Sequence, residues 1–217
     1  MKKKRFLLKI FLIAIALPIV TGLSGQTIPD QSLLMARAPA KFTALFKTTQ
    51  GDFTIEVVRE LSPAGADRLF QLLKSGFYNN NGLFRVQTGY VIQFGIGDNK
   101  NLNEFWDKRI LPDEPRIVSN SKGTVSYARD GINSRTVQLF INLKDNVKLD
   151  TVNYNGVKGF TPVARITQGY ETVEKFYAGY GFEPANHQDS IMVSGNAYLK
   201  KKFPKIDYVI EAVITQE

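Results

Sequence analysis

Apolar and polar residues alternate along residues 41–49 (KFTALFKTT) and 51–60 (GDFTIEVVRE). A period of two is typical of strands with one buried face, and the Gln50-Gly51 pair between the two segments is typical of a tight turn. We therefore predict a β-hairpin that begins near Lys41.

A second alternating segment, residues 84–94 (FRVQTGYVIQF), carries two polar side chains that its apolar pattern does not explain. The segment predicts two short strands joined at Thr88-Gly89. A charge on a buried face costs several kcal/mol unless it has a partner or a function. We therefore expect Arg85 and Gln93 to line a cleft or to lie on a solvated face.

Residues 62–76 show the pattern of a helix, with Ser62 at the N-cap, Pro63 at the first helical position and Gly76 as the stop. Residues 169–179 (GYETVEKFYAG) show a second helical pattern between two glycines. Between the second hairpin and the next strands, residues 95–122 form a polar segment that we expect to be a long loop.

Four further β-rich runs follow, at residues 123–128, 137–143, 160–166 and 208–214. Many short strands with two helices indicate a mainly β protein, and we expect a closed β-barrel with helical caps. The sequence shows no internal repeat.

The composition excludes several kinds of site. With 217 residues, of which 43% are hydrophobic, the protein is large enough for one domain with a substantial core. The absence of cysteine excludes disulfides, thiolate metal sites and cysteine nucleophiles. The single histidine, His187, lies in a turn-rich stretch (EPANHQDS) that is typical of an exposed loop, so we do not expect it to be catalytic.

The N-terminus has the three parts of a secretory signal peptide. A basic start (MKKKR) precedes an apolar run and then small residues, so we predict a signal peptide at residues 1–25. We expect residues 26–40 to be a linker or N-terminal arm, and residues 41–217 to be the folded domain. Export to the periplasm or the extracellular space follows, with membrane anchoring as the alternative if the signal is retained.

Removal of the signal peptide changes the net charge. The full sequence has a net charge of +8, but five of its 28 basic residues lie in the signal, which leaves 23 against 20 acidic residues, or +3. We therefore expect no nucleic-acid binding, and no stable membrane association after cleavage. The cluster Lys200-Lys201-Lys202 is too short to indicate more than a solvated surface.

The order and spacing of six segments resemble the cyclophilin family of peptidyl-prolyl cis-trans isomerases, and in particular an exported bacterial branch. The resemblance covers about residues 42–180. The segments that carry it are residues 46–57, 62–98, 119–130, 136–146, 149–150 and 160–174.

This resemblance implies a closed eight-stranded antiparallel β-barrel, capped by two α-helices, with a peptide groove on its outer surface. It implies that Arg85 is the catalytic arginine and Gln93 a groove glutamine, and that the protein needs no cofactor and no metal. The expected partners are proline-containing polypeptides, and we expect a monomer. The remaining groove residues implied by the motifs are Tyr90, Val91, Ala128, Arg129, Gln138, Phe140, Lys148, Leu149 and Phe160.

Several of these positions depart from the family pattern. Tyr90 stands where phenylalanine is common. Phe160 stands where eukaryotic members commonly have histidine. Lys148 replaces an aromatic residue that many members have, and Arg129 replaces a small polar residue, which would add charge beside the groove. These departures leave substrate preference open.

Two other functions fit parts of the sequence. A groove without its aromatic wall could hold proline-containing segments as a chaperone module without catalysis. A barrel could instead bind a small ligand in its interior, as lipocalins do, but the dense apolar pattern favours a filled interior.

Overall fold

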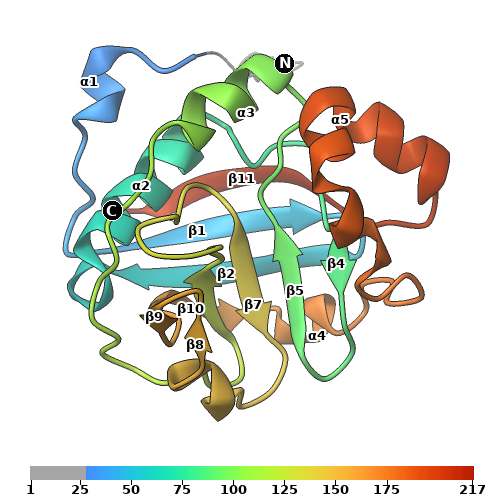
Figure 1. Ribbon diagram of the computed structural model, residues 1–217. Coiled ribbons are helices and arrows are strands. Elements are labelled where there is room, and N and C mark those ends of the chain that lie inside the picture. Colours follow the sequence, from blue (N-terminus) through green and yellow to red (C-terminus); the bar gives the residue numbers. More distant parts are fainter. Residues whose placement is uncertain (1–27) are drawn as a thin grey trace, which may run out of the picture.

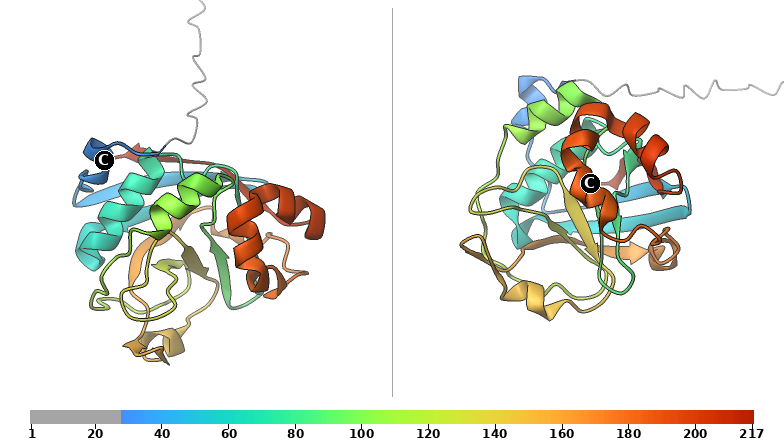
Figure 2. Two further views of the ribbon diagram at one scale, coloured as in Figure 1. Left: turned by 45° about the horizontal axis from the view of Figure 1, so that its top comes forward. Right: turned by 45° about the vertical axis from the view of Figure 1, so that its right-hand side comes forward.

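The computed structural model describes residues 28–217, so the predicted signal peptide lies outside the described residues. The dominant feature is one curled antiparallel sheet, with most helices gathered at one end (Figures 1 and 2). The strands are β1 (Lys41–Thr48), β2 (Gly51–Val58), β3 (Asn81–Gly82), β4 (Arg85–Val86), β5 (Val91–Phe94), β6 (Thr124–Tyr127), β7 (Leu139–Asn142), β8 (Asn153–Tyr154), β9 (Val157–Lys158), β10 (Pro162–Gln168) and β11 (Tyr208–Gln216). The helices are α1 (Gln31–Leu34), α2 (Pro63–Lys74), α3 (Lys100–Asp107), α4 (Tyr170–Val173) and α5 (Gln188–Lys202), with 3-10 turns η1 (Arg59–Leu61), η2 (Val147–Asp150) and η3 (Glu183–His187).

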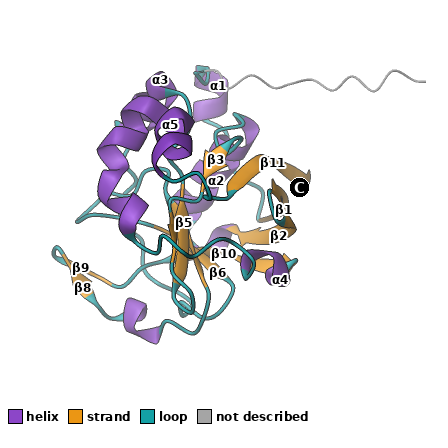
Figure 3. Ribbon diagram, turned by 90° about the vertical axis from the view of Figure 1, so that its right-hand side faces the viewer, coloured by secondary structure: helices purple, strands orange, loops and turns teal. Residues whose placement is uncertain are grey.

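The sheet has nine strands in the order β3-β11-β1-β2-β10-β6-β7-β5-β4, and it stays open. Its two edge strands, β3 and β4, follow each other in sequence, yet within residues 28–217 no ladder joins them. The prediction of a closed eight-stranded barrel is therefore wrong in strand number and closure, whereas the mainly β, antiparallel, curled sheet is confirmed. β8 and β9 form a separate hairpin that projects from the body (Figure 3).

A second apolar cluster lies where closure was expected. It joins α5 to the edge strands and consists of Phe84, Ile96, Ala185, Ile191, Leu199, Phe203 and Ile206. Gly82 on β3 permits this contact, because a Cβ atom there would collide with Leu199 of α5. The edge of the sheet is thus covered by a helix, which protects it from pairing with another chain.

The main core lies between the sheet and α2. Every second residue of the strands faces this core and is buried. These residues include Ile55, Ile92, Phe94, Leu139 and Ile141. One face of α2 packs against them through Ala66, Leu69, Phe70 and Leu73, as the helical pattern predicts. The strand residues between them therefore point to the outer face of the sheet.

The helices confirm the sequence pattern in part. α2 forms where predicted, with Ser62 at its N-cap, although its hydroxyl does not cap the helix. The helix expected at residues 169–179 is reduced to α4, and the segment predicted as a loop contains α3. The sequence analysis missed α5, which is interrupted at Gly195 by a non-helical backbone conformation.

The segment before β1 lies along α2. Gln71 on α2 donates hydrogen bonds to the carbonyl oxygens of Leu34 and Ala36, at 3.0 and 2.9 Å. The backbone N–H of Ala38 donates to Asp67 at 2.9 Å. No helix of residues 28–217 is long and apolar enough to cross a membrane.

Candidate active site

Four residues lie directly opposite one another across β4, β5, β7 and β6 on the outer face of the sheet. Arg85 pairs with Gln93, Gln93 with Phe140, and Phe140 with Ser126. We refer to these four residues as the outer row. The two-residue period of the strands places them opposite the core side, as the sequence analysis expected for Arg85 and Gln93.

Arg85 begins a series of side-chain hydrogen bonds along this face. Its Nη1 donates to Oε1 of Gln93 at 3.0 Å, Gln93 Nε2 donates to Gln138 at 2.9 Å, and Gln138 Nε2 donates to Gln188 at 2.9 Å. We call this the Arg85–Gln188 series. Because arginine can only donate, it fixes the orientation of each amide in turn.

The Arg85 guanidinium lies between two aromatic rings. Its Cζ is 5.5 Å from the centroid of Tyr90 and 4.8 Å from that of Phe182. Its Nε donates to Gln87 at 2.7 Å, so Gln87 and Gln93 hold the guanidinium at two of its nitrogen atoms. Burial lowers the pKa of Arg85, an effect that the Tyr90 hydroxyl opposes, and the group stays cationic.

A group of apolar side chains lies next to the outer row. The rings of Phe140 and Phe160 meet edge to face, with 5.4 Å between their centroids. The carbonyl oxygen of Leu149, a half-buried residue of η2, accepts a 2.9 Å hydrogen bond from the Phe160 backbone N–H. Val91 is buried two residues before Gln93, on the same side of β5. Phe140 and Val91 are 5% and 2% exposed, whereas Phe160 and Leu149 are half-buried and present apolar surface to solvent.

The wall formed by η2 and Phe160 is fixed by Asn120 and Asp150. Asn120 donates from its backbone and its side chain to Asp150, both at 2.8 Å, and from its side chain to the Phe160 carbonyl at 2.9 Å. Burial tends to raise the pKa of Asp150, but the hydrogen bonds from Ser119 and Asn120 lower it below its usual value. The Asp150 carboxylate therefore remains ionised at neutral pH.

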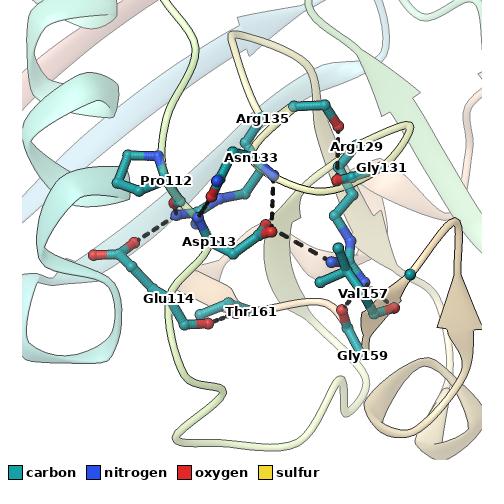
Figure 4. A network of polar contacts seen from close by, with 12 residues as sticks. Pro112, Asp113, Glu114, Arg129, Gly131, Asn133, Arg135, Val157, Gly159 and Thr161 are labelled. Carbon is teal, nitrogen blue, oxygen red and sulfur yellow. Dashed lines mark hydrogen bonds and ion pairs between the residues drawn. The ribbon is translucent and has the colours of Figure 1, made fainter.

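Arg129, Asp113, Glu114 and Arg135 belong to a network of polar contacts (Figure 4). The side chain of Arg129 is only 3% exposed, lies 4.7 Å from the Phe160 ring centroid, and donates to the carbonyl oxygens of Val157 and Gly159. Oδ1 of Asp113 lies 3.7 Å from Nη1 of Arg129, so the two side chains form an ion pair. The positive charge that the sequence analysis placed beside the groove is instead buried, because these oxygens and the aromatic ring draw the guanidinium inward.

Glu114 links this network to the start of α2. Its carboxylate accepts hydrogen bonds from the backbone N–H of Ala64 at 2.7 Å, from the Ser62 hydroxyl, and from Arg135 at 2.9 Å. Glu114 thus caps α2 in place of the Ser62 side chain. A cavity of about 20 Å³ between Glu114, Arg129 and Arg135 is large enough for one water molecule.

The remaining predicted residues lie at the edge of this site. The backbone N–H of Ala128 donates to the Gln138 carbonyl at 2.9 Å, so it is engaged within the sheet. The Lys148 side chain is exposed on η2. His187 lies on η3, and its Nε2 is 3.1 Å from Oε1 of Glu183. It does not take part in the Arg85–Gln188 series. The sequence analysis missed Phe182 and Gln188, because no local pattern connects them to β4 or β7.

A family model for the cyclophilin type peptidyl-prolyl cis-trans isomerase/CLD matches residues 43–194. The chain belongs to this cyclophilin family. The match spans the outer row, the apolar side chains next to it and the Arg85–Gln188 series. This cyclophilin is therefore a peptidyl-prolyl cis-trans isomerase.

Relatives with this activity in their names cover much of the chain. Peptidyl-prolyl cis-trans isomerase B of Escherichia coli is 28% identical over 79% of this cyclophilin and 98% of its own length. A peptidyl-prolyl cis-trans isomerase of Acinetobacter baylyi is 29% identical over 66% of this chain and 76% of its own.

A solved structure shares the fold. A cyclophilin type isomerase of Cryptosporidium parvum superposes with a TM-score of 0.59 at 19% identity, covering 82% of this chain and 99% of its own. A second structure of that protein was obtained in the presence of the dipeptide Ala-Pro.

Proposed function

We propose that this cyclophilin accelerates rotation about X-Pro bonds in exported proteins, with Arg85 as the group that stabilises the twisted transition state. The observation that carries the proposal is the Arg85 guanidinium, held by Gln87 and Gln93 at one end of the outer row that contains Phe140. A cationic donor thus lies near a group of apolar side chains on one face of the sheet.

The chemistry of the reaction requires such a donor. Rotation of the peptide bond has a barrier of about 18–20 kcal/mol, because resonance gives the C–N bond partial double-bond character. In the twisted state the proline nitrogen regains its lone pair and can accept a hydrogen bond. A fixed arginine that donates to this nitrogen lowers the barrier without breaking a covalent bond.

The apolar side chains near Arg85 support a proline-containing segment as the substrate. The proline ring would lie against Phe140, Phe160 and Leu149, while Gln93 and Gln138 offer amide groups to the peptide backbone. The Ala-Pro dipeptide used with the Cryptosporidium parvum relative is of the same chemical class. Arg129 and Tyr90 would act at the borders of this group, one against Phe160 and one beside Arg85.

Export is supported by the N-terminal sequence. The basic and apolar pattern of residues 1–25 is that of a signal peptide, which fits a bacterial enzyme acting on proteins that fold after transport. Proline isomerisation takes tens of seconds or more without catalysis and can limit such folding. Mass spectrometry of the protein from a periplasmic fraction tests this point: an N-terminus near residue 26 is expected, and an intact Met1 in the cytoplasmic fraction would contradict export.

The catalytic role is tested by exchange NMR on a short X-Pro peptide. Arg85→Ala should reduce kcat/KM by about 10²–10³-fold, the loss typical of a single transition-state donor. Arg165→Ala is the matched control, because Arg165 is an exposed arginine paired with Glu56 on β2. An unchanged isomerisation rate in Arg85→Ala would show that Arg85 is not the catalytic group.

A further inference from the structure

The segment between α4 and α5 lies against β4, at the Arg85 end of the outer row. The backbone N–H of Val86, the neighbour of Arg85, donates to the Gly181 carbonyl at 3.3 Å, and the two residues form a β-bridge. Gln188, the first residue of α5 directly after this segment, accepts the last hydrogen bond of the Arg85–Gln188 series. The segment is thus attached to the site at Gly181 and at its C-terminal end, where α5 begins.

We propose that Phe182 in this segment is a substrate contact, and that it selects substrates with a bulky apolar side chain next to the proline. The inference rests on the proposed function, because it requires that the peptide bond be placed at Arg85. It assigns Phe182 a role in substrate preference rather than in the isomerisation step.

The geometry places the Phe182 ring beside the Arg85 guanidinium. The Phe182 centroid is 4.8 Å from Arg85 Cζ, so a peptide that reaches the guanidinium also approaches the ring. The ring is 45% exposed, and it belongs to neither apolar cluster of the described residues. Phe182 therefore has apolar surface available for a ligand.

The backbone around Phe182 leaves room for that ligand. Gly181 has a φ of +54°, a left-handed conformation that favours glycine, and no heavy atom lies within 4 Å of a Cβ position there. The chain thus turns at an open surface immediately before the ring.

Charge and apolar surface together define the preferred side chain. A leucine or phenylalanine beside the proline would cover the exposed part of Phe182 and gain from burial. A lysine or arginine in the same place would meet the Arg85 cation and be repelled.

The test compares kcat/KM across peptides in which the residue before or after the proline is glycine, leucine, phenylalanine or lysine. The protein should prefer leucine and phenylalanine over glycine and lysine at one of these positions. Phe182→Ala should reduce that preference by about fivefold, as expected for loss of a partly buried apolar contact. Phe182→Tyr should retain the preference. So should Val193→Ala, because Val193 is an exposed apolar residue of α5 in neither cluster.

Two results would overturn the proposal. One is a wild-type protein that shows no preference at either flanking position. The other is an equal loss on every peptide in Phe182→Ala, which would mean that the ring only positions Arg85. Peptide affinities measured by NMR titration separate this test from that of the proposed function: Arg85→Ala decides the catalytic role, whereas the ratio of affinities in Phe182→Ala decides the contact.

Discussion

The guanidinium of Arg129 lies against the ring of Phe160, with 4.7 Å between Cζ and the ring centroid. The Phe160 ring is therefore supported by a buried cation, and that cation is held in turn by Asp113 and by two backbone carbonyl groups. The position of the Phe160 ring thus depends on residues that lie behind it.

Replacing Arg129 tests this support. Arg129→Met keeps an apolar stem of similar length but leaves the Val157 and Gly159 carbonyl oxygens without their donor. We expect the free energy of unfolding to fall by about 1–3 kcal/mol and KM for an X-Pro peptide to rise more than kcat falls. Denaturant unfolding and steady-state kinetics measure both. Arg165→Met, at an exposed arginine, should change stability by less than about 0.5 kcal/mol; equal effects of the two variants would contradict a supporting role for Arg129.

The Arg85–Gln188 series predicts a graded loss of activity. Gln93→Leu removes the acceptor of Arg85 Nη1, whereas Gln188→Leu removes only the acceptor of Gln138, two links away. We expect kcat/KM to fall by about tenfold for Gln93→Leu, a modest fraction of the loss expected for the donor itself, and less for Gln188→Leu. Gln168→Leu, at an exposed glutamine of β10, is the control. Equal rates in Gln93→Leu and the control would show that the series does not position Arg85.

Glu114 should make stability depend on pH. Burial alone would raise its pKa, but hydrogen bonds from Ser62, Ala64 and Arg135 lower that pKa below the usual value. Its ionised form therefore stabilises the fold above the unfolded pKa of about 4.3, and this contribution is lost as pH falls through the lower folded pKa.

Glu114→Gln isolates this contribution. At pH 7 the variant should be less stable by about 3 kcal/mol, because Arg135 keeps a buried charge without its partner. The difference in the free energy of unfolding between the variant and the wild type should shrink between about pH 5 and pH 3. Protonation of the other carboxylates in this range affects both proteins alike. Unfolding curves at pH 7, 5, 4 and 3 measure it. Glu174→Gln, in an exposed pair with Lys122, should show no such trend. A difference that stays constant with pH would contradict the role of the Glu114 charge.

Gly159 precedes Phe160 and has a φ of +70°, and a Cβ atom there would collide with the Asp150 carbonyl. Gly159→Ala should therefore displace the wall formed by η2 and Phe160, lower the melting temperature and raise KM. Gly89→Ala is a matched control: its φ is +64°, but no heavy atom lies within 4 Å of the added methyl group. It should cost only the left-handed backbone strain of about 1–2 kcal/mol. Similar losses in both variants would mean that the collision at Asp150 is relieved without moving the wall.

The sequence by itself determined the local elements and the faces of the strands. The two-residue period of 84–94 predicted that Arg85 and Gln93 would share one side of a hairpin, and the structure pairs them directly. Proline, glycine and the apolar spacing predicted α2, because helix signals act within a few residues. The sequence of α3 contains a helix signal in its N-cap Asn99 and in the buried residues Leu102 and Trp106. The polar residues between them made the segment resemble a loop.

Only the tertiary structure decided which distant residues meet. Arg129 is buried rather than exposed, Glu114 caps a helix fifty residues earlier in the chain, and Phe182 lies against Arg85. α5 also packs against β3 at one edge of the open sheet, although residues 188–202 contain no regular apolar face that predicts this helix. Such contacts depend on the curl of the sheet and on the packing of segments far apart in sequence. Local periodicity contains no information about either, so residue patterns predicted the hairpin that carries Arg85, whereas the fold decided which residues surround it.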